Sequence, residues 1–154
     1  MRIGIAADHD GFDFKQEIAD ELQAAGHKVI DFGAWQLNPN DDYADFVIQL
    51  ARALSTHRIE RGIALCGSSL GASVCANKVA GVRAGVAYDQ FSVWQGVESD
   101  YINLICLDGR AGGRSAAWDL VQTFLAAEFR PAERNLQRLG KLAHLETTRI
   151  DPTS

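Results

Sequence analysis

The stretch that decides the fold is Gly62-Ile63-Ala64-Leu65-Cys66-Gly67-Ser68-Ser69-Leu70-Gly71-Ala72-Ser73. It predicts a short apolar strand that ends on a cysteine, then a glycine-serine loop, then a helix from Ala72 to Lys78. Free N–H groups and partial positive charge collect at a helix N-terminus, and this field lowers the pKa of a nearby thiol. Cys66 is therefore a candidate base or nucleophile, and the loop amides can hold a negative oxygen. Simple packing of a buried cysteine is the alternative.

Strand and helix patterns alternate along the chain. The expected strands are Arg2 to Ala7, Lys28 to Phe32, Ile63 to Cys66, Val82 to Ala87 and Leu104 to Leu107. Apolar residues at helical spacing predict helices from about Phe12 to Ala25, through Phe46 to Leu54, from about Gln90, and from Ala116 to Ala127 with Trp118, Val121 and Leu125 facing inward. This order predicts a doubly wound α/β domain of three layers, with a five-stranded parallel sheet that binds ligands at its carboxyl edge.

A last helix is expected beyond Pro131, from Ala132 to about Glu146. It repeats Leu136, Leu139, Leu142 and Leu145 at helical spacing, although little of the sheet is left for it to cover. We therefore expect this leucine stripe to pack on another subunit. Residues 1–149 read as a single domain and residues 150–154 as a loose C-terminal tail.

Composition narrows the classes of partner. The net charge of −5 over 154 residues argues against a broad nucleic-acid surface. No apolar run reaches membrane-spanning length, and the first residues begin a strand and not a signal peptide. We expect a cytoplasmic protein with reduced thiols at Cys66, Cys75 and Cys106. The cysteines have no clustered spacing with histidine, so no metal is expected.

Polar residues follow the first two strands of this pattern. Asp8 and His9 leave the first strand at the edge where Cys66 ends the third, and Tyr43 can reach the same edge. Together they suggest hydrogen-bond partners for a polyol or a phosphate. The structural alternatives are a helix N-cap for Asp8, a solvated His9 and a half-buried Tyr43.

Three arginines could bind an anion. Arg110 follows the fifth strand on its carboxyl side, and Arg134 and Arg138 are four residues apart on one face of the last helix. Such a pair can hold a phosphate through bidentate contacts, and a solvated helix face is the alternative.

These residues belong to a series of short motifs that occur in order. They are Asp8-His9-x-Gly11-Phe12, Asp42-Tyr43, Cys66-Gly67-Ser68-Ser69-x-Gly71-x-Ser73, Ala76-Asn77-Lys78, Gly81-Val82-Arg83-Ala84, Asn103-Leu104 and Gly109-Arg110. The series resembles the ribose-5-phosphate isomerase type B family, which includes galactose-6-phosphate isomerase subunits. The resemblance spans roughly Met1 to Glu146. It implies a Rossmann-like sugar-phosphate isomerase without metal or cofactor, working as a homodimer or a dimer of dimers.

The resemblance also implies roles for individual residues. Cys66 would shuttle a proton between C1 and C2 of the sugar, and Ser68, where the family usually has threonine, would help move a proton between the two oxygens. The backbone of Gly67 to Gly71, with Ser69 and Leu70 between them, would form the oxyanion hole. Asp8, His9 and Tyr43 would contact the sugar. The phosphate would be held by Arg110, Arg134 and Arg138, the last two donated by the partner subunit.

One segment departs from the family. The family usually has His-Asn-Asp-x-Asn before the fifth strand, and this chain has Ser99-Asp100-Tyr101-Ile102-Asn103. In the family that histidine opens a cyclic sugar, and serine does not titrate near neutral pH. Asp8, Asp100 or His9 could replace it as the acid–base group. The substrate could instead be acyclic, such as a four-carbon sugar phosphate, or the protein could bind sugar phosphates without turnover.

Two smaller departures lie close to the site. Ser69 stands where the family commonly has glycine, which we expect to reshape the oxyanion loop. Asn135 stands where the family commonly has histidine, which we expect to weaken a phosphate contact.

Overall fold

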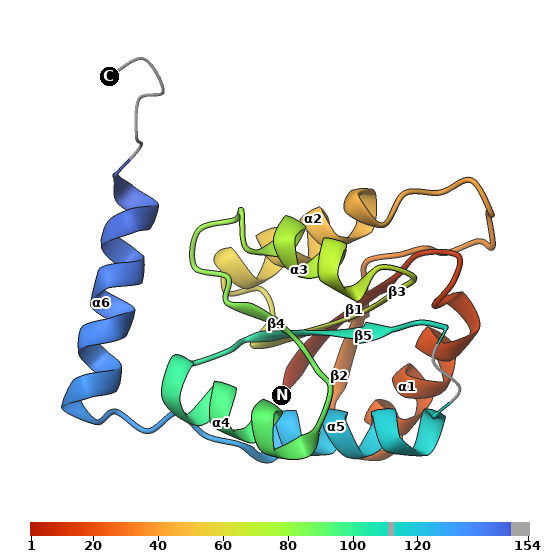
Figure 1. Cartoon of the computed structure of the whole chain (residues 1–154). Helices are drawn as coiled ribbons and strands as arrows, with labels where there is room; N and C mark the ends of the chain where they lie inside the picture. Colours follow the sequence, from red (N-terminus) through yellow and green to blue (C-terminus); the bar gives the residue numbers. More distant parts are fainter. Residues whose placement is uncertain (111–112, 149–154) are drawn as a thin grey trace.

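The protein is an α/β sandwich around one parallel sheet (Figure 1). The computed structural model describes residues 1–110 and 113–148, so the predicted tail at 150–154 lies outside the described residues. The strands are β1 (Arg2–Ala7), β2 (Lys28–Asp31), β3 (Arg61–Cys66), β4 (Ala84–Val86) and β5 (Leu104–Asp108). They pair in parallel in the order β2-β1-β3-β5-β4, which confirms the predicted doubly wound sheet.

Helices cover both faces of the sheet. In the described part of the chain they are α1 (Phe12–Ala24), α2 (Tyr43–Ser55), α3 (Ser69–Ala76), α4 (Gln90–Asp100), α5 (Arg114–Ala126) and α6 (Glu133–Thr147). Helices α2 and α3 lie above the sheet in Figure 1, and α1, α4 and α5 lie below it. Because side chains alternate along a strand, Ile3 and Ile5 of β1 enter the lower core and Ala6 enters the upper one.

Helix α3 begins three residues earlier than the sequence pattern predicted. Ser68 is its N-cap, and the Ser68 hydroxyl accepts a hydrogen bond from the Gly71 N–H at 3.0 Å. Ser69 and Leu70 therefore belong to the first helical turn. The serine cap that fixes this start was present in the sequence, but the apolar periodicity begins only at Ala72.

The inward face of helix α5 differs from the predicted one. Val121 is fully buried as predicted, whereas Trp118 and Leu125 are only partly buried against the core. The large side chain that fills this face is Phe124, which is also fully buried. It lies over the guanidinium of Arg61, 4.9 Å from the ring centroid, and so closes the lower core near the start of β3.

Helix α6 stands apart from the sheet (Figure 1). Asn135 is its one buried residue among those described, and Leu136, Leu142 and Leu145 are 50%, 44% and 64% exposed. The predicted leucine stripe therefore exists, and three of its four leucines are largely exposed in the single chain. Its use in dimerisation stays a prediction.

Candidate active site

The candidate site lies where β1, β3 and β5 end. Cys66 closes β3 and pairs in register with Asp108, the last residue of β5. The loop after β1 brings Asp8 and His9 to the same edge, and Arg110 follows β5. The carboxyl ends of three adjacent strands thus gather the residues that the sequence suggested.

Cys66 is fully buried, in the upper core beside Ala6 and Ala72. Burial, and then the negative charge of Asp8, raise the pKa of the Cys66 thiol well above its usual range. A hydrogen bond from the Asp8 backbone acts in the opposite direction and is the weaker effect. The expectation of a lowered pKa is therefore wrong for the single chain, because loss of solvation outweighs the field of the helix N-terminus.

The Asp8 carboxylate ties two loops together. It is 4% exposed and accepts hydrogen bonds from the backbone N–H groups of Asp10, Gly11 and Gly67, at 3.1 to 3.3 Å. Asp8 thus holds the β1 loop against the β3 loop. Contact between Asp8 and a substrate remains a prediction.

The predicted row of free amides is shorter than expected. The Gly67 N–H donates to Asp8, and the Gly71 N–H donates to the Ser68 hydroxyl. Those two amides are occupied by the protein's own acceptors. The amides of Ser69 and Leu70, at the open start of α3, have no acceptor among the described residues and are the ones suited to an oxyanion.

His9 is held by a residue that sequence reasoning missed. Its Nδ1 lies 2.6 Å from Asp41 Oδ1, and its backbone N–H donates to the same oxygen at 3.0 Å. Its Nε2 lies 3.7 Å from Asp10 Oδ2. The hydrogen bond with Asp41 raises the pKa of His9, and the charges of Asp10, Asp41 and Asp8 add to this effect. The sequence feature that could have pointed to Asp41 is the acidic pair Asp41-Asp42 directly before Tyr43.

Tyr43 and Arg110 complete this edge. Tyr43 is the first residue of α2, after the N-cap Asp42, and a Cβ atom on Gly71 would overlap its hydroxyl. The Arg110 Nη2 donates to the Gly67 carbonyl at 2.6 Å, and the Arg110 backbone N–H donates to Asp108 at 2.9 Å. Both predicted residues therefore border the β3–α3 loop.

Four other predicted residues lie elsewhere in the single chain. Ser99 and Asp100 end α4, which runs from the carboxyl edge back to the amino edge of the sheet. Asp100 lines a cavity of about 680 Å³ with Arg83 and the Leu142 side of α6. Ser99 and Asp100 therefore do not lie beside Cys66 within one chain, and their part in the site stays a prediction.

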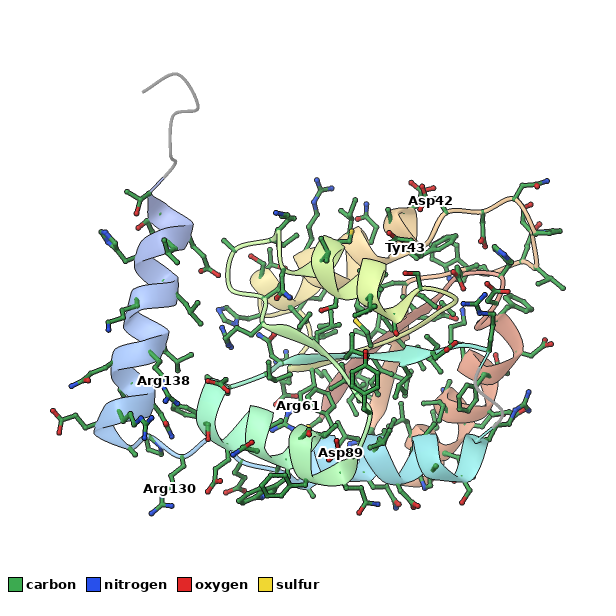
Figure 2. The ribbon with its side chains drawn as sticks, in the orientation of Figure 1. Asp42, Tyr43, Arg61, Asp89, Arg130 and Arg138 are labelled. Carbon is green, nitrogen blue, oxygen red and sulfur yellow. The ribbon has the colours of Figure 1, made fainter. Side chains whose placement is uncertain are left out.

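Arg134 and Arg138 are also remote from Cys66. Both are exposed on α6, and Figure 2 shows Arg138 across the molecule from Tyr43. Asn135 between them turns inward and donates to the Arg130 carbonyl at 3.0 Å. These residues can approach a carboxyl-edge site only if it belongs to a second subunit.

The described residues also bear on the expected partners. No group of three or more histidine, cysteine, aspartate or glutamate side chains in that part of the chain could hold a metal ion. No helix within residues 1–110 and 113–148 has both the length and the apolar character needed to cross a membrane.

Comparison with known proteins identifies the family. The sequence model described as Ribose/Galactose Isomerase matches residues 3–142. The chain belongs to this family. The match includes the carboxyl-edge residues and both arginines of α6, and it confirms the resemblance seen in the motifs.

Individual members of the ribose/galactose isomerase family agree with this assignment. The ribose-5-phosphate isomerase B of Clostridium thermocellum is 41% identical, with a TM-score of 0.90 over 95% of this chain and 97% of that one. The Mycoplasma genitalium enzyme, solved with bound ribulose-5-phosphate, is 31% identical, with a TM-score of 0.89 over 96% and 97%. The D-erythrulose-4-phosphate isomerase of Pectobacterium atrosepticum is 32% identical over 95% of this chain and 97% of its own.

Proposed function

We propose that the protein is an aldose–ketose isomerase for a small phosphorylated sugar, working through an enediolate at the carboxyl edge of the sheet. The observation that carries the proposal is the gathering of Asp8, His9, Cys66 and Arg110 at that edge, in a chain of the ribose/galactose isomerase family. A relative with the same fold has been solved with ribulose-5-phosphate bound. Turnover, and not binding alone, is the simplest use of this arrangement.

An acyclic substrate fits this chain best. Ser99 stands where the family has the acid–base residue that opens a sugar ring, and serine cannot take its place near neutral pH. A four-carbon sugar with a terminal phosphate has no free hydroxyl for a stable ring, so it needs no ring opening. A relative of similar length and identity is named for D-erythrulose 4-phosphate. We therefore propose a four-carbon sugar phosphate as the preferred substrate.

The proposed chemistry is a proton shuttle. The base removes a proton from the carbon beside the carbonyl group, and the negative charge moves onto oxygen as the enediolate forms. The free N–H groups of Ser69 and Leu70 stabilise that oxygen, and the proton returns to the neighbouring carbon. We assign the base to Cys66, which acts from its minor thiolate form because burial raises the pKa of its thiol. Ser68 can relay a proton between the two oxygens once its hydroxyl leaves the α3 cap.

A second copy of the chain is proposed to complete the site. Around the β3–α3 loop of one chain, carboxylates outnumber cations. The carboxylates belong to Asp8, Asp10, Asp41 and Asp108, and the cations are His9 and Arg110. A phosphate dianion needs more positive charge than this. Arg134 and Arg138 can supply it from the partner's α6, whose exposed leucines would be buried in the same contact. Ser99 and Asp100 would reach the site by the same route. A homodimer or a dimer of dimers satisfies this arrangement.

The test is a panel of four-, five- and six-carbon sugar phosphates followed by NMR, with wild type and Ser99→His side by side. We expect the highest kcat/KM on a four-carbon substrate. We also expect Ser99→His to raise activity only on sugars that form rings. Equal gains of Ser99→His on acyclic and cyclic substrates would contradict the substrate assignment. Thermal stabilisation by these compounds without any product would instead indicate a binding protein.

A further inference from the structure

Asp41 is a buried carboxylate that lies outside the family motifs and points at His9. Its side chain is 7% exposed, compared with 30% for His9. One oxygen, Oδ1, contacts both the His9 backbone N–H and the His9 Nδ1. These two contacts hold the Nδ1 side of the imidazole, and Nε2, 3.7 Å from Asp10 Oδ2, is the ring nitrogen that can donate to a ligand.

The second Asp41 oxygen leaves the buried carboxylate only partly paired. Asp41 Oδ2 is buried and has no hydrogen-bond partner among the described residues. A buried carboxylate with an unsatisfied oxygen is costly unless a positive charge compensates it. His9 can carry this charge, because its Nδ1 lies 2.6 Å from the other oxygen of the same carboxylate, Oδ1. The contact with Asp41 therefore favours the imidazolium form of His9.

The other charges around His9 favour the same state. Asp8 and Asp10 flank it on its own loop, and both raise the pKa of His9, as Asp41 does. Arg110 lies across the β3–α3 loop, where its guanidinium donates to the Gly67 carbonyl and its backbone N–H donates to Asp108. His9 follows β1 and Arg110 follows β5, so both groups lie at the carboxyl edge, where Arg110 contacts Gly67.

We propose that Asp41 is a positioning residue that holds His9 as an imidazolium with its Nε2–H turned toward the phosphate of the bound sugar. The proposal rests on the function proposed above. It adds a reason why the site binds the phosphate of its substrate over a wider pH range. An imidazolium donates from both nitrogens, so Nδ1 can serve Asp41 while Nε2 serves the phosphate in a charge-assisted hydrogen bond. Asp41 keeps this donor charged at a pH where an isolated histidine would have lost its proton.

The test compares Asp41→Asn with Asp45→Asn, an exposed neighbour in the first turn of α2. Inorganic phosphate affinity is measured by calorimetry at pH 5.5 and 8, and the His9 titration by NMR. We expect Asp41→Asn to lower the His9 midpoint and to weaken phosphate binding about tenfold at pH 8. At pH 5.5, where His9 is charged in either variant, we expect a loss of less than about threefold. Asp45→Asn should match wild type. Equal phosphate affinity of Asp41→Asn and wild type at pH 8 would overturn the proposal.

Steady-state kinetics distinguish two roles of the Asp41–His9 pair, phosphate binding and proton transfer. With a sugar phosphate that the wild type converts, Asp41→Asn should raise KM at pH 8 and leave kcat within about threefold. A fall in kcat at unchanged KM would contradict the phosphate role and assign the pair to acid–base chemistry. If the wild type converts no sugar phosphate, the proposed function fails, while the phosphate and NMR measurements still decide the role of Asp41.

A second variant protects the test against misfolding. His9→Gln removes the charge and keeps a donor. In that background, Asp41→Asn should cause no further loss of phosphate affinity, because both changes act through one cation. Additive losses would show that Asp41 does not act through His9.

Discussion

At Cys66, burial in the core disfavours the thiolate that the proposed chemistry requires. The Cys66 side chain is buried in the upper core, and burial raises the pKa of its thiol, so the free chain holds it in the neutral form at neutral pH. Below the pKa of a thiol, the thiolate fraction grows about tenfold per pH unit. A base of this kind makes the enzyme faster as the pH rises.

We therefore expect kcat of the wild type to increase between pH 7 and pH 9, since a saturated enzyme reports the base in the bound state. The measurement is kcat against pH on a four-carbon sugar phosphate. The control is Cys106→Ala, because Cys106 is also buried, on β5, and burial raises its pKa to about 12. This variant should show the same slope as wild type. A flat wild-type profile would exclude a thiolate base.

Gly71 shows how closely two site loops approach each other. A side chain there would overlap the Tyr43 hydroxyl, so Gly71→Ala must displace Tyr43 or the first turn of α3. We expect Gly71→Ala to lower the free energy of unfolding by about 1–3 kcal/mol, as overpacking does. Tyr43→Phe removes the overlapping hydroxyl, so the double variant should recover part of that loss. Strictly additive losses in thermal unfolding would mean that the two side chains do not meet.

At the scale of elements, the loop between β2 and α2 carries Asp41. Lys15 of α1 contacts the first residues of this loop and the end of β2. The Lys15 ammonium is 4% exposed and contacts both oxygens of Asp31 at 2.8 Å, together with the Ala34 carbonyl. Helix α1 thereby holds the start of the loop that carries Asp41.

We expect Lys15→Met to reduce the free energy of unfolding by about 2 kcal/mol. A fully buried pair would lose about 3–5 kcal/mol, but Asp31 is 40% exposed and water can replace part of the contact. Chemical denaturation measures the change. Lys28→Met, on the exposed side of β2, should stay within about 0.5 kcal/mol of wild type. Equal effects of the two substitutions would show that Lys15 holds nothing in place.

The sequence predicted the elements well because each strand is a short apolar run and each helix has an apolar stripe. It also predicted that Asp8, His9, Cys66 and Arg110 share one edge, since parallel strands end together. It failed where a contact between distant segments decides the outcome. Three features depend on residues far apart in the chain: the burial of Cys66, the hydrogen bond from the Gly67 amide to Asp8, and the contact of His9 with Asp41. No local pattern encodes such contacts.

At the scale of the whole molecule, α6 and the end of α4 carry site candidates that face away from the chain's own carboxyl edge. If they serve a partner, active sites are shared, and defects in different chains can complement each other. We expect Cys66→Ala and Arg138→Ala to be nearly inactive alone. When they are co-expressed, roughly a quarter of wild-type activity should return, because half of randomly formed dimers contain one intact site. No recovery in mixed dimers would place both residues in the site of the same chain.

The most direct test of proton transfer at Cys66 is deuterium incorporation from D2O into the carbon-bound positions of a four-carbon sugar phosphate, read by NMR. The wild type and Cys106→Ala should incorporate deuterium at similar rates. Cys66→Ala should be slower by at least about 10²-fold, the usual contribution of a general base. Incorporation at an unchanged rate in Cys66→Ala would show that another group moves the proton.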